Sequence, residues 1–153
     1  MATDRLQELR DGLAIDQHNL DEELIRQPQL YYEVGQLSSI AVSRRDAAKD
    51  ALKRLEAELY VETKRLFEKA DKRVTENAVS AEIERNPRFV EARDRINKLT
   101  RRAAEIEALK DAYQQRSYVL KDLASLWIAG FYSNSSVSGR VSKDAQKKLY
   151  EER

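Results

Sequence analysis

Two clusters of basic side chains are the residues of this sequence with the clearest chemical potential. The first cluster holds Arg44, Arg45, Lys49, Lys53 and Arg54, and the second holds Lys98, Arg101 and Arg102. Spacings of three and four residues bring side chains onto one helix face, so each cluster can form a strip of positive charge. Lysine and arginine neutralise phosphates whatever the base sequence. We therefore expect these eight residues to form a surface for a nucleic-acid backbone.

The distribution of charge along the chain leaves a second interpretation open. Net charge is +1, but residues 4–33 hold eight acids against three arginines, and residues 85–121 hold ten bases against five acids. Asp46 and Asp50 flank the first basic cluster, so pairs within the helix could neutralise part of it. The alternative to a phosphate-binding surface is therefore a solvated helix face with mixed ion pairs.

The residues that most enzymes need are scarce. There is no cysteine, and His18, the single histidine, lies between polar residues where a capping or exposed role is expected. Glu22 and Glu23 are adjacent and point to different helix faces, which does not build a two-carboxylate site. The few glycines form no phosphate-binding loop. We expect no enzyme activity, no metal site and no cofactor.

The basic clusters must be positioned by long helices. Glycine and proline are rare, at 4 and 2 residues, and 36% of residues are charged, which is typical of long helices rather than of a sandwich or barrel. An apolar three-four spacing predicts the core positions of two such helices. The predicted positions are Leu30, Val34, Leu37, Ala41, Ala48, Ala51, Leu55, Leu59, Leu66, Ala70 and Val74 in the first, and Phe89, Ala92, Ile96, Leu99, Ala103, Ile106, Tyr113, Leu120, Leu123 and Trp127 in the second.

Proline, glycine and capping residues predict where the helices begin and end. Pro28 suits the first turn of a long helix over about 28–75, preceded by short helices that begin near Thr3 or Asp4 and near Asp16 or Asn19. The pair Asn86-Pro87 suits the start of a second long helix over 87–128, which Gly130 ends. Residues 76–85 are expected to form a short helix between them through Val79 and Ile83.

The sequence therefore predicts an all-α protein whose two long helices form an elongated hairpin or coiled-coil-like bundle, with short helices at both ends. A helical domain is expected over 1–130. A tail over 131–153 is expected to contain the polar linker "SNSSVSG" and a short terminal helix that begins at Ser142. Two long helices with one apolar face each bury little core per residue, so self-assembly is the expected remedy.

The aromatic residues allow base stacking as a hypothesis beside packing. Tyr31 and Tyr32 are adjacent and so lie about 100° apart on a helix. Tyr31 is expected to be structural and Tyr32 to have the freer face. Tyr113 and Trp127 are expected in the core, and Tyr60 lies at the edge of the apolar stripe.

Several stretches of residues 15–123 together resemble the UvsY-type recombination mediators of tailed phages. The stretches are "IDQHNLDEEL", "QPQLYYEV", "SSIAVSRRDAAKDALKRLEAEL", "ENAVSAEIERNPRFVEA" and "ALKDAYQQRSYVLKDL", in which Arg116, Leu120 and Lys121 match the family in type and spacing. The similarity is spread over the chain and contains no single signature motif. The chain departs from the family near the end of the first long helix, where Glu56 and Glu58 stand at the places of DNA-contacting bases. This shifts the expected contacts one turn back, to Lys49, Lys53 and Arg54.

The resemblance implies a function and a set of partners. Such mediators are non-enzymatic, bind single-stranded DNA and form ring-like homo-oligomers. They help to load a RecA-like recombinase onto strands covered by single-strand-binding protein, in phage recombination and repair. A phage protein of this kind would act in the host cell cytoplasm.

Two other functions remain open from the sequence. One is an oligomeric coiled-coil structural or assembly protein without nucleic-acid binding, and the other is a helical adaptor whose acidic first thirty residues bind a basic partner. The absence of cysteine fits a cytoplasmic location, and neither a signal peptide nor a membrane span is expected.

Overall fold

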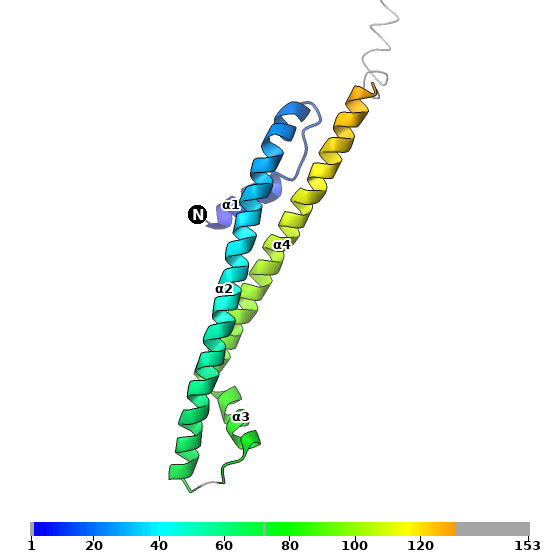
Figure 1. The fold of residues 1–153 in the computed structure, drawn as a ribbon. Coiled ribbons are helices and arrows are strands. Elements are labelled where there is room, and N and C mark those ends of the chain that lie inside the picture. The colour runs from blue at the N-terminus through cyan, green and yellow to red at the C-terminus, as the bar shows by residue number, and fades with distance from the viewer. Residues whose placement is uncertain (1, 72, 131–153) are drawn as a thin grey trace, which may run out of the picture. The chain divides into compact units, whose positions relative to one another are not determined.

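Four helices make up most of the part of the chain that the structure describes. A computed structural model describes residues 2–71 and 73–130, with α1 (Ala2–Asp11), α2 (Leu20–Lys69), α3 (Glu76–Arg85) and α4 (Pro87–Ile128). The long helices α2 and α4 pack against each other, as Figure 1 shows, and no strand occurs in these ranges. The prediction of an all-α fold with two long helices is therefore confirmed.

The preference of proline for the first turn of a helix predicted that the first long helix begins at Pro28, but α2 begins at Leu20. Pro28 lies inside α2, and the short helix that was expected to begin near Asp16 or Asn19 is the start of α2 rather than a separate helix. A proline inside a helix costs about 3 kcal/mol, because it removes a hydrogen bond and crowds the carbonyl four residues earlier. Just before the proline, the side chains of Glu23 and Gln27 are both bonded to Arg116 of α4. These contacts fasten to α4 the turn of α2 that precedes the proline.

The ends of α3 and the start of α4 follow the predicted local chemistry. The hydroxyl of Thr75 accepts a hydrogen bond from the backbone N–H of Ala78 at 3.3 Å, which caps α3. The side-chain oxygen of Asn86 accepts one from the N–H of Arg88 at 2.9 Å, and Pro87 is the first residue of α4. Both caps satisfy N–H groups that have no partner inside the helix.

The other helix ends differ in how well they were predicted. Gly130 follows α4 and has a φ of 72°, a left-handed conformation that glycine adopts at low cost, as predicted. The first long helix ends at Lys69, about six residues before the predicted end at 75. Asp71 follows with a φ of 53°, a conformation that aspartate tolerates better than most residues.

The chain forms two compact units. Unit 1 contains Met1–Tyr32 and Asp111–Arg153, and unit 2 contains Glu33–Lys110. Each unit therefore includes α2 and α4 segments. The predicted tail over 131–153, with its linker and its helix from Ser142, lies outside the described residues, and the division into a 1–130 domain and a tail stays a prediction.

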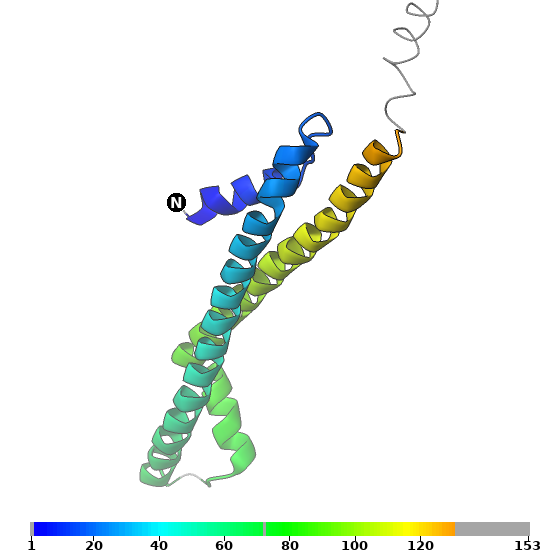
Figure 2. The same cartoon turned by 45° about the horizontal axis from the view of Figure 1, so that its top comes forward.

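Tyr113 lies at the centre of unit 1. Its side chain is fully buried, and its hydroxyl donates a hydrogen bond of 2.7 Å to the carbonyl of Leu9 in α1. A Cβ at Gly12 would lie 2.9 Å from that hydroxyl oxygen, so glycine permits the close approach of the chain after α1. Figure 2 shows α1, in dark blue, joined by a loop to the start of α2. Leu6 and Leu120 are buried in the same unit.

Arg116 joins three segments of unit 1. Its guanidinium donates to the carboxylate of Glu23 and, at 2.5 Å, to the side-chain oxygen of Gln27. It also donates to the carbonyls of Leu13 and Ala14, at 3.3 Å each. The residue is only 4% exposed, so this charge is buried and fully bonded. Arg116 therefore fastens α4 to the start of α2 and to the α1–α2 loop.

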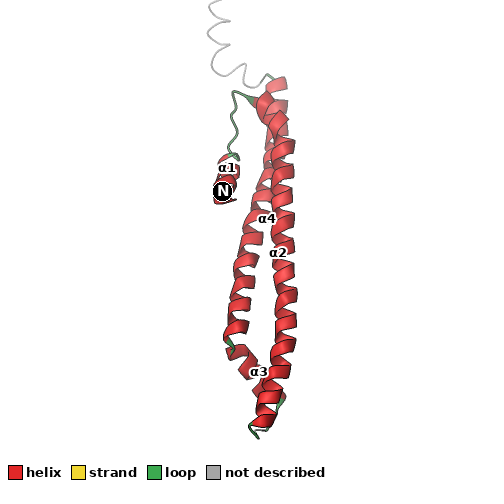
Figure 3. Cartoon of the chain, turned by 90° about the vertical axis from the view of Figure 1, so that its left-hand side faces the viewer, coloured by secondary structure: helices red, strands yellow, loops and turns green. Residues whose placement is uncertain are grey.

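The core of unit 2 lies where α3 meets α2. Leu59, Val79 and Ile83 are buried together, and four half-buried side chains surround them, namely Leu55, Tyr60, Phe67 and Phe89. Figure 3 shows α3 beside the last part of α2. The predicted use of Val79 and Ile83 as the apolar face of α3 is confirmed.

Several predicted core positions are exposed. Leu66, Ala70 and Val74 lie at the end of α2 or beyond it, where the ten residues of α3 do not cover them. Trp127 is 53% exposed, and no residue of α4 after Leu120 is buried. Ala51 is exposed for another reason, since it borders an open groove in unit 2.

Candidate nucleic-acid interface

The middle of unit 2 is an open stretch of the α2–α4 pair. No residue of α2 from 42 to 58 is buried, and none of α4 from 87 to 102 is buried. Between these two stretches lies a groove of about 550 Å³. Alanines supply much of the α2 wall, and their short side chains do not reach the facing helix.

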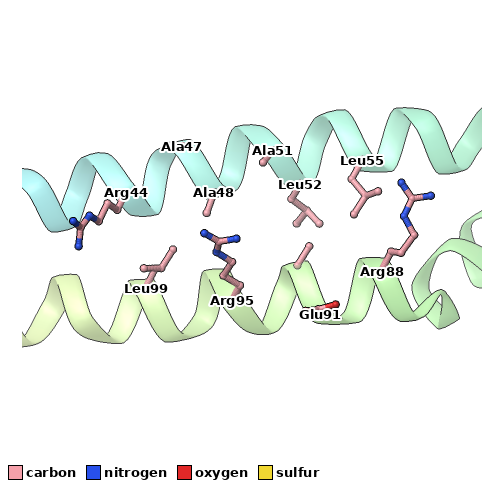
Figure 4. A pocket seen from close by; sticks show the side chains of 11 residues that line it. Arg44, Ala47, Ala48, Ala51, Leu52, Leu55, Arg88, Glu91, Arg95 and Leu99 are labelled. Carbon is pink, nitrogen blue, oxygen red and sulfur yellow. The ribbon is translucent and has the colours of Figure 1, made fainter.

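The groove has an apolar wall and basic side chains. Figure 4 shows the two helices running in opposite directions, with the side chains of Arg44, Arg88 and Arg95 in the space between them. Its lining consists of Arg44, Ala47, Ala48, Ala51, Leu52, Leu55, Arg88, Glu91, Ala92, Arg95 and Leu99. Three guanidinium groups thus face one carboxylate, and no aromatic side chain lines the groove.

The predicted basic cluster on α2 does not form one surface. At 3.6 residues per turn, Arg45, Lys49 and Lys53 share one strip, while Arg44 lines the groove and Arg54 lies on the other flank of the helix. This distribution follows from the adjacent pairs in the sequence, since neighbouring residues lie about 100° apart.

Part of the positive charge on α2 is neutralised within the helix. Arg45 donates to the carboxylate of Asp46 at 2.9 Å, and the Lys49 ammonium lies 4.0 Å from the same carboxylate. The hydrogen bond from Arg45 lowers the pKa of the Asp46 carboxyl and raises the pKa of the Arg45 guanidinium. Lys53 and Arg54 are exposed and form no ion pair within residues 5–71 and 73–130. The expected ion pairs with acids of the same helix are therefore real but involve only part of the cluster.

The second predicted cluster forms a continuous patch on α4. Lys98, Arg101 and Arg102 line a shallow depression of about 330 Å³ together with Glu105. Arg102 donates to the Glu105 carboxylate at 3.3 Å, and in the described part of the chain Lys98 and Arg101 form no ion pair. Two of these three bases are therefore available to an external anion.

The structure brings both clusters into one unit. Residues 44–54 of α2 hold five bases and two acids, and residues 88–102 of α4 hold six bases and two acids. The groove joins these two stretches, which together carry an excess of seven positive charges, and Glu58 and Glu62 of α2 offset part of this excess by pairing with Arg88. Charges this close reinforce one another and attract a polyanion.

Arg88 and Arg95 are groove residues that the sequence analysis did not select. Arg88 lies 3.5 Å from the carboxylates of both Glu58 and Glu62 on α2, so it also links the two helices. The sequence held a signal for these residues, because Arg88, Arg95 and Arg102 recur every seven positions, which keeps them beside the apolar stripe of α4.

The aromatic residues are mostly structural. Tyr113 is buried as predicted, and Tyr31 is half-buried. The Tyr60 hydroxyl donates to the Glu76 carboxylate at 2.9 Å, and this bond raises the pKa of Tyr60. Tyr32 is 67% exposed, which agrees with the freer face predicted for it. It belongs to unit 1, whereas all eight predicted DNA-binding residues belong to unit 2.

Other kinds of site lack the residues they need in the described ranges. No three His, Cys, Asp or Glu side chains of residues 5–71 and 73–130 gather in a way that could hold a metal ion. His18 is exposed, and its backbone N–H donates to the Asp16 carboxylate. None of the described helices combines the length and apolar character needed to cross a bilayer.

Comparison with known proteins adds no relative. No protein-family model, curated protein or solved structure matches this chain.

Proposed function

We propose that this chain is a non-enzymatic, single-stranded DNA-binding recombination mediator. The observation that carries the proposal is the excess of seven positive charges on facing stretches of α2 and α4 in unit 2. The resemblance of residues 15–123 to UvsY-type mediators supports it independently. In this role the protein helps to load a RecA-like recombinase onto strands covered by single-strand-binding protein, in the cytoplasm of a phage-infected host.

The proposed DNA contacts are the outward bases of unit 2. Lys49 and Lys53 follow one strip of α2, Arg54 lies on its other flank, and Lys98 and Arg101 supply the patch on α4. Such side chains neutralise phosphates without reading bases. The groove itself suits DNA less well, because bases of a single strand bind best by stacking on aromatic side chains.

Self-assembly makes this weak surface effective. A homo-oligomer, in the proposal a ring, repeats the basic patch, so a strand that touches several subunits is held by avidity rather than by one strong site. Wrapping the strand in this way loosens the single-strand-binding protein and presents DNA to the recombinase.

The binding test uses a labelled single-stranded oligonucleotide and fluorescence anisotropy over a series of salt concentrations. The variant Lys49→Ala/Lys53→Ala/Arg54→Ala removes three proposed contacts. Each lost phosphate contact reduces the magnitude of the slope of log K against log salt by about 0.7, so this magnitude should fall by about 2 for each subunit that the strand contacts. The matched control, Lys64→Ala/Arg65→Ala/Lys69→Ala, removes the same residue types from exposed positions on the same helix.

The control variant should keep a slope closer to that of the natural chain. Absence of DNA binding by the natural chain at low salt would overturn the proposal. Equal slopes for the two triple variants would overturn the assignment of the contacts to Lys49, Lys53 and Arg54.

The second candidate function is an oligomeric coiled-coil assembly protein without nucleic-acid binding. The open groove favours it, because an exposed apolar seam between two long helices is a place for a further helix. Under this alternative the protein forms oligomers but does not bind DNA. Replacing its basic residues would then change nothing in the anisotropy assay.

A further inference from the structure

The groove of unit 2 has the size and lining of a docking site for a helix. It is open along both stretches that lack buried residues, and its wall presents Leu52, Leu55 and Leu99 beside small alanines. Leucines beside short side chains form the kind of hole that a side chain of another helix can enter. A side chain entering this groove would remove apolar surface of both helices from water.

The charge of the groove selects an acidic occupant. Arg44 and Arg95 form no ion pair with any described residue, and Arg88 alone is engaged, with Glu58 and Glu62. Carboxylates at the rim of a docked helix would pair with these two guanidinium groups, which bind carboxylates well. The occupant should therefore carry both acidic and apolar side chains.

The start of α2 carries a surface of this chemistry. Residues 20–32 present Asp21, Glu22, Ile25 and Tyr32 on the side of the helix away from Gln27, and all four are exposed. Ile25 is 77% exposed, the highest value for an apolar side chain of this segment. Neither Asp21 nor Glu22 forms an ion pair within the described residues. We define this face as the acidic-apolar face.

We propose that the acidic-apolar face of one copy docks into the unit 2 groove of a second copy. Asp21 and Glu22 then meet Arg44 and Arg95, while Ile25 and Tyr32 cover the leucines and alanines of the wall. The inference deepens the self-assembly in the proposed function, and it does not depend on DNA binding. Because the two surfaces differ, the contact is heterologous, and its repetition produces a ring or an open filament.

Other occupants match the groove less well. The tail over 131–153 holds five bases and three acids, so its charge has the same sign as the groove. Single-stranded DNA has the right charge but finds no aromatic side chain there. The acidic-apolar face offers both the acids and the apolar side chains that the lining requires.

The test measures mass in solution by analytical ultracentrifugation without DNA. Asp21→Arg/Glu22→Arg reverses the charge of the docking face, and Arg44→Glu/Arg95→Glu reverses the charge of the groove. Each double variant should shift the mass to that of a single chain. The four changes combined in one chain restore opposite charges and should restore the assembly, which a loss of folding could not do.

Matched controls separate the contact from general charge effects. Glu82→Arg/Glu84→Arg changes two exposed acids on α3, and Lys64→Glu/Arg65→Glu changes two exposed bases on α2. Both should leave the mass unchanged. The proposal is overturned if the natural chain is a single chain at all concentrations, if the double variants assemble normally, or if the fourfold variant stays a single chain. DNA binding by Lys49, Lys53 and Arg54 is measured separately, so the two proposals can fail independently.

Discussion

Replacement of Arg116 by methionine should destabilise the protein more than any exposed substitution of the same kind. Methionine has a similar length, so the change removes charge and hydrogen bonds without opening a large cavity. Arg116 is buried and bonded to Glu23, Gln27 and two loop carbonyls. Removing one partner of a buried ion pair costs about 3–5 kcal/mol, because the other charge is left without compensation.

The size of this effect depends on how well water can reach the groups left behind. The Glu23 side chain is 14% exposed, so its carboxylate would be only partly hydrated. Gln27 would lose the donor to its side-chain oxygen but keep its own bond of 2.6 Å to the Tyr113 carbonyl. A loss of about 4 kcal/mol moves the urea midpoint by about 2 M if the slope is about 2 kcal/mol per molar urea.

A second variant tests whether the charge pair is responsible. Arg116→Met combined with Glu23→Leu removes both charges, so no isolated carboxylate remains. Replacing a buried pair by apolar residues is often neutral, and both variants share the remaining cost, which is about 1–3 kcal/mol for each buried acceptor that is left without a donor. The double variant should therefore be more stable than Arg116→Met alone.

Urea unfolding followed by circular dichroism measures these differences at one fixed protein concentration, because assembly also contributes to stability. The control is Arg93→Met, which changes an exposed arginine of the same helix and should stay within about 0.5 kcal/mol of the natural chain. If Arg116→Met behaves like this control, or if the double variant is less stable than the single one, the buried-pair reasoning is refuted.

Two further predictions concern local contacts of unit 2. Tyr60 should ionise above its ordinary pKa of 10.0, because its hydroxyl is bonded to Glu76 and the carboxylate charge opposes a second negative charge. This contribution to stability is present below pH 10.0 and is lost as pH rises through the higher pKa of the folded state. Glu76→Gln should bring the tyrosinate absorbance transition of Tyr60 back toward the ordinary value, and an unchanged transition would contradict the cause assigned to the shift. Asn86→Ala should lower the free energy of unfolding by about 1 kcal/mol in urea, because it removes the side-chain cap of α4. The control is Asn77→Ala, which changes an exposed asparagine of α3. Equal losses for the two variants would show that the cap is not the stabilising group.

Local sequence signals predicted the helices wherever short-range chemistry decides the outcome. Asn86, Pro87 and Gly130 set the bounds of α4, because a cap, a first-turn proline and a left-handed glycine act within a few residues. Pro28 misled for the opposite reason. The contacts of the turn that precedes it come from Arg116, some ninety positions later in the chain, and no local pattern contains them.

The candidate site was predicted in part. The basic clusters were visible as composition, and the structure places both in unit 2. Their division over several helix faces follows from 100° per residue and could have been anticipated for Arg44 and Arg45. The groove could not be predicted from the sequence, because it depends on which alanines of α2 face which residues of α4. That pairing is a tertiary property, as is the burial of Arg116.

Arginine has two different roles in this chain, and the surroundings of each arginine side chain explain its role. Arg116 is enclosed by four oxygen acceptors from two segments, so four of its five N–H donors are already bonded and its charge is compensated by Glu23. Arg44 and Arg95 face leucine and alanine side chains and have no ion-pair partner in the described ranges. A guanidinium is more weakly hydrated than the ammonium of lysine and can bind a carboxylate through two N–H groups at once. The groove therefore presents apolar side chains to water together with two guanidinium groups that have no ion-pair partner in the described ranges. One acidic amphipathic helix would cover the apolar side chains and supply carboxylates to the guanidinium groups.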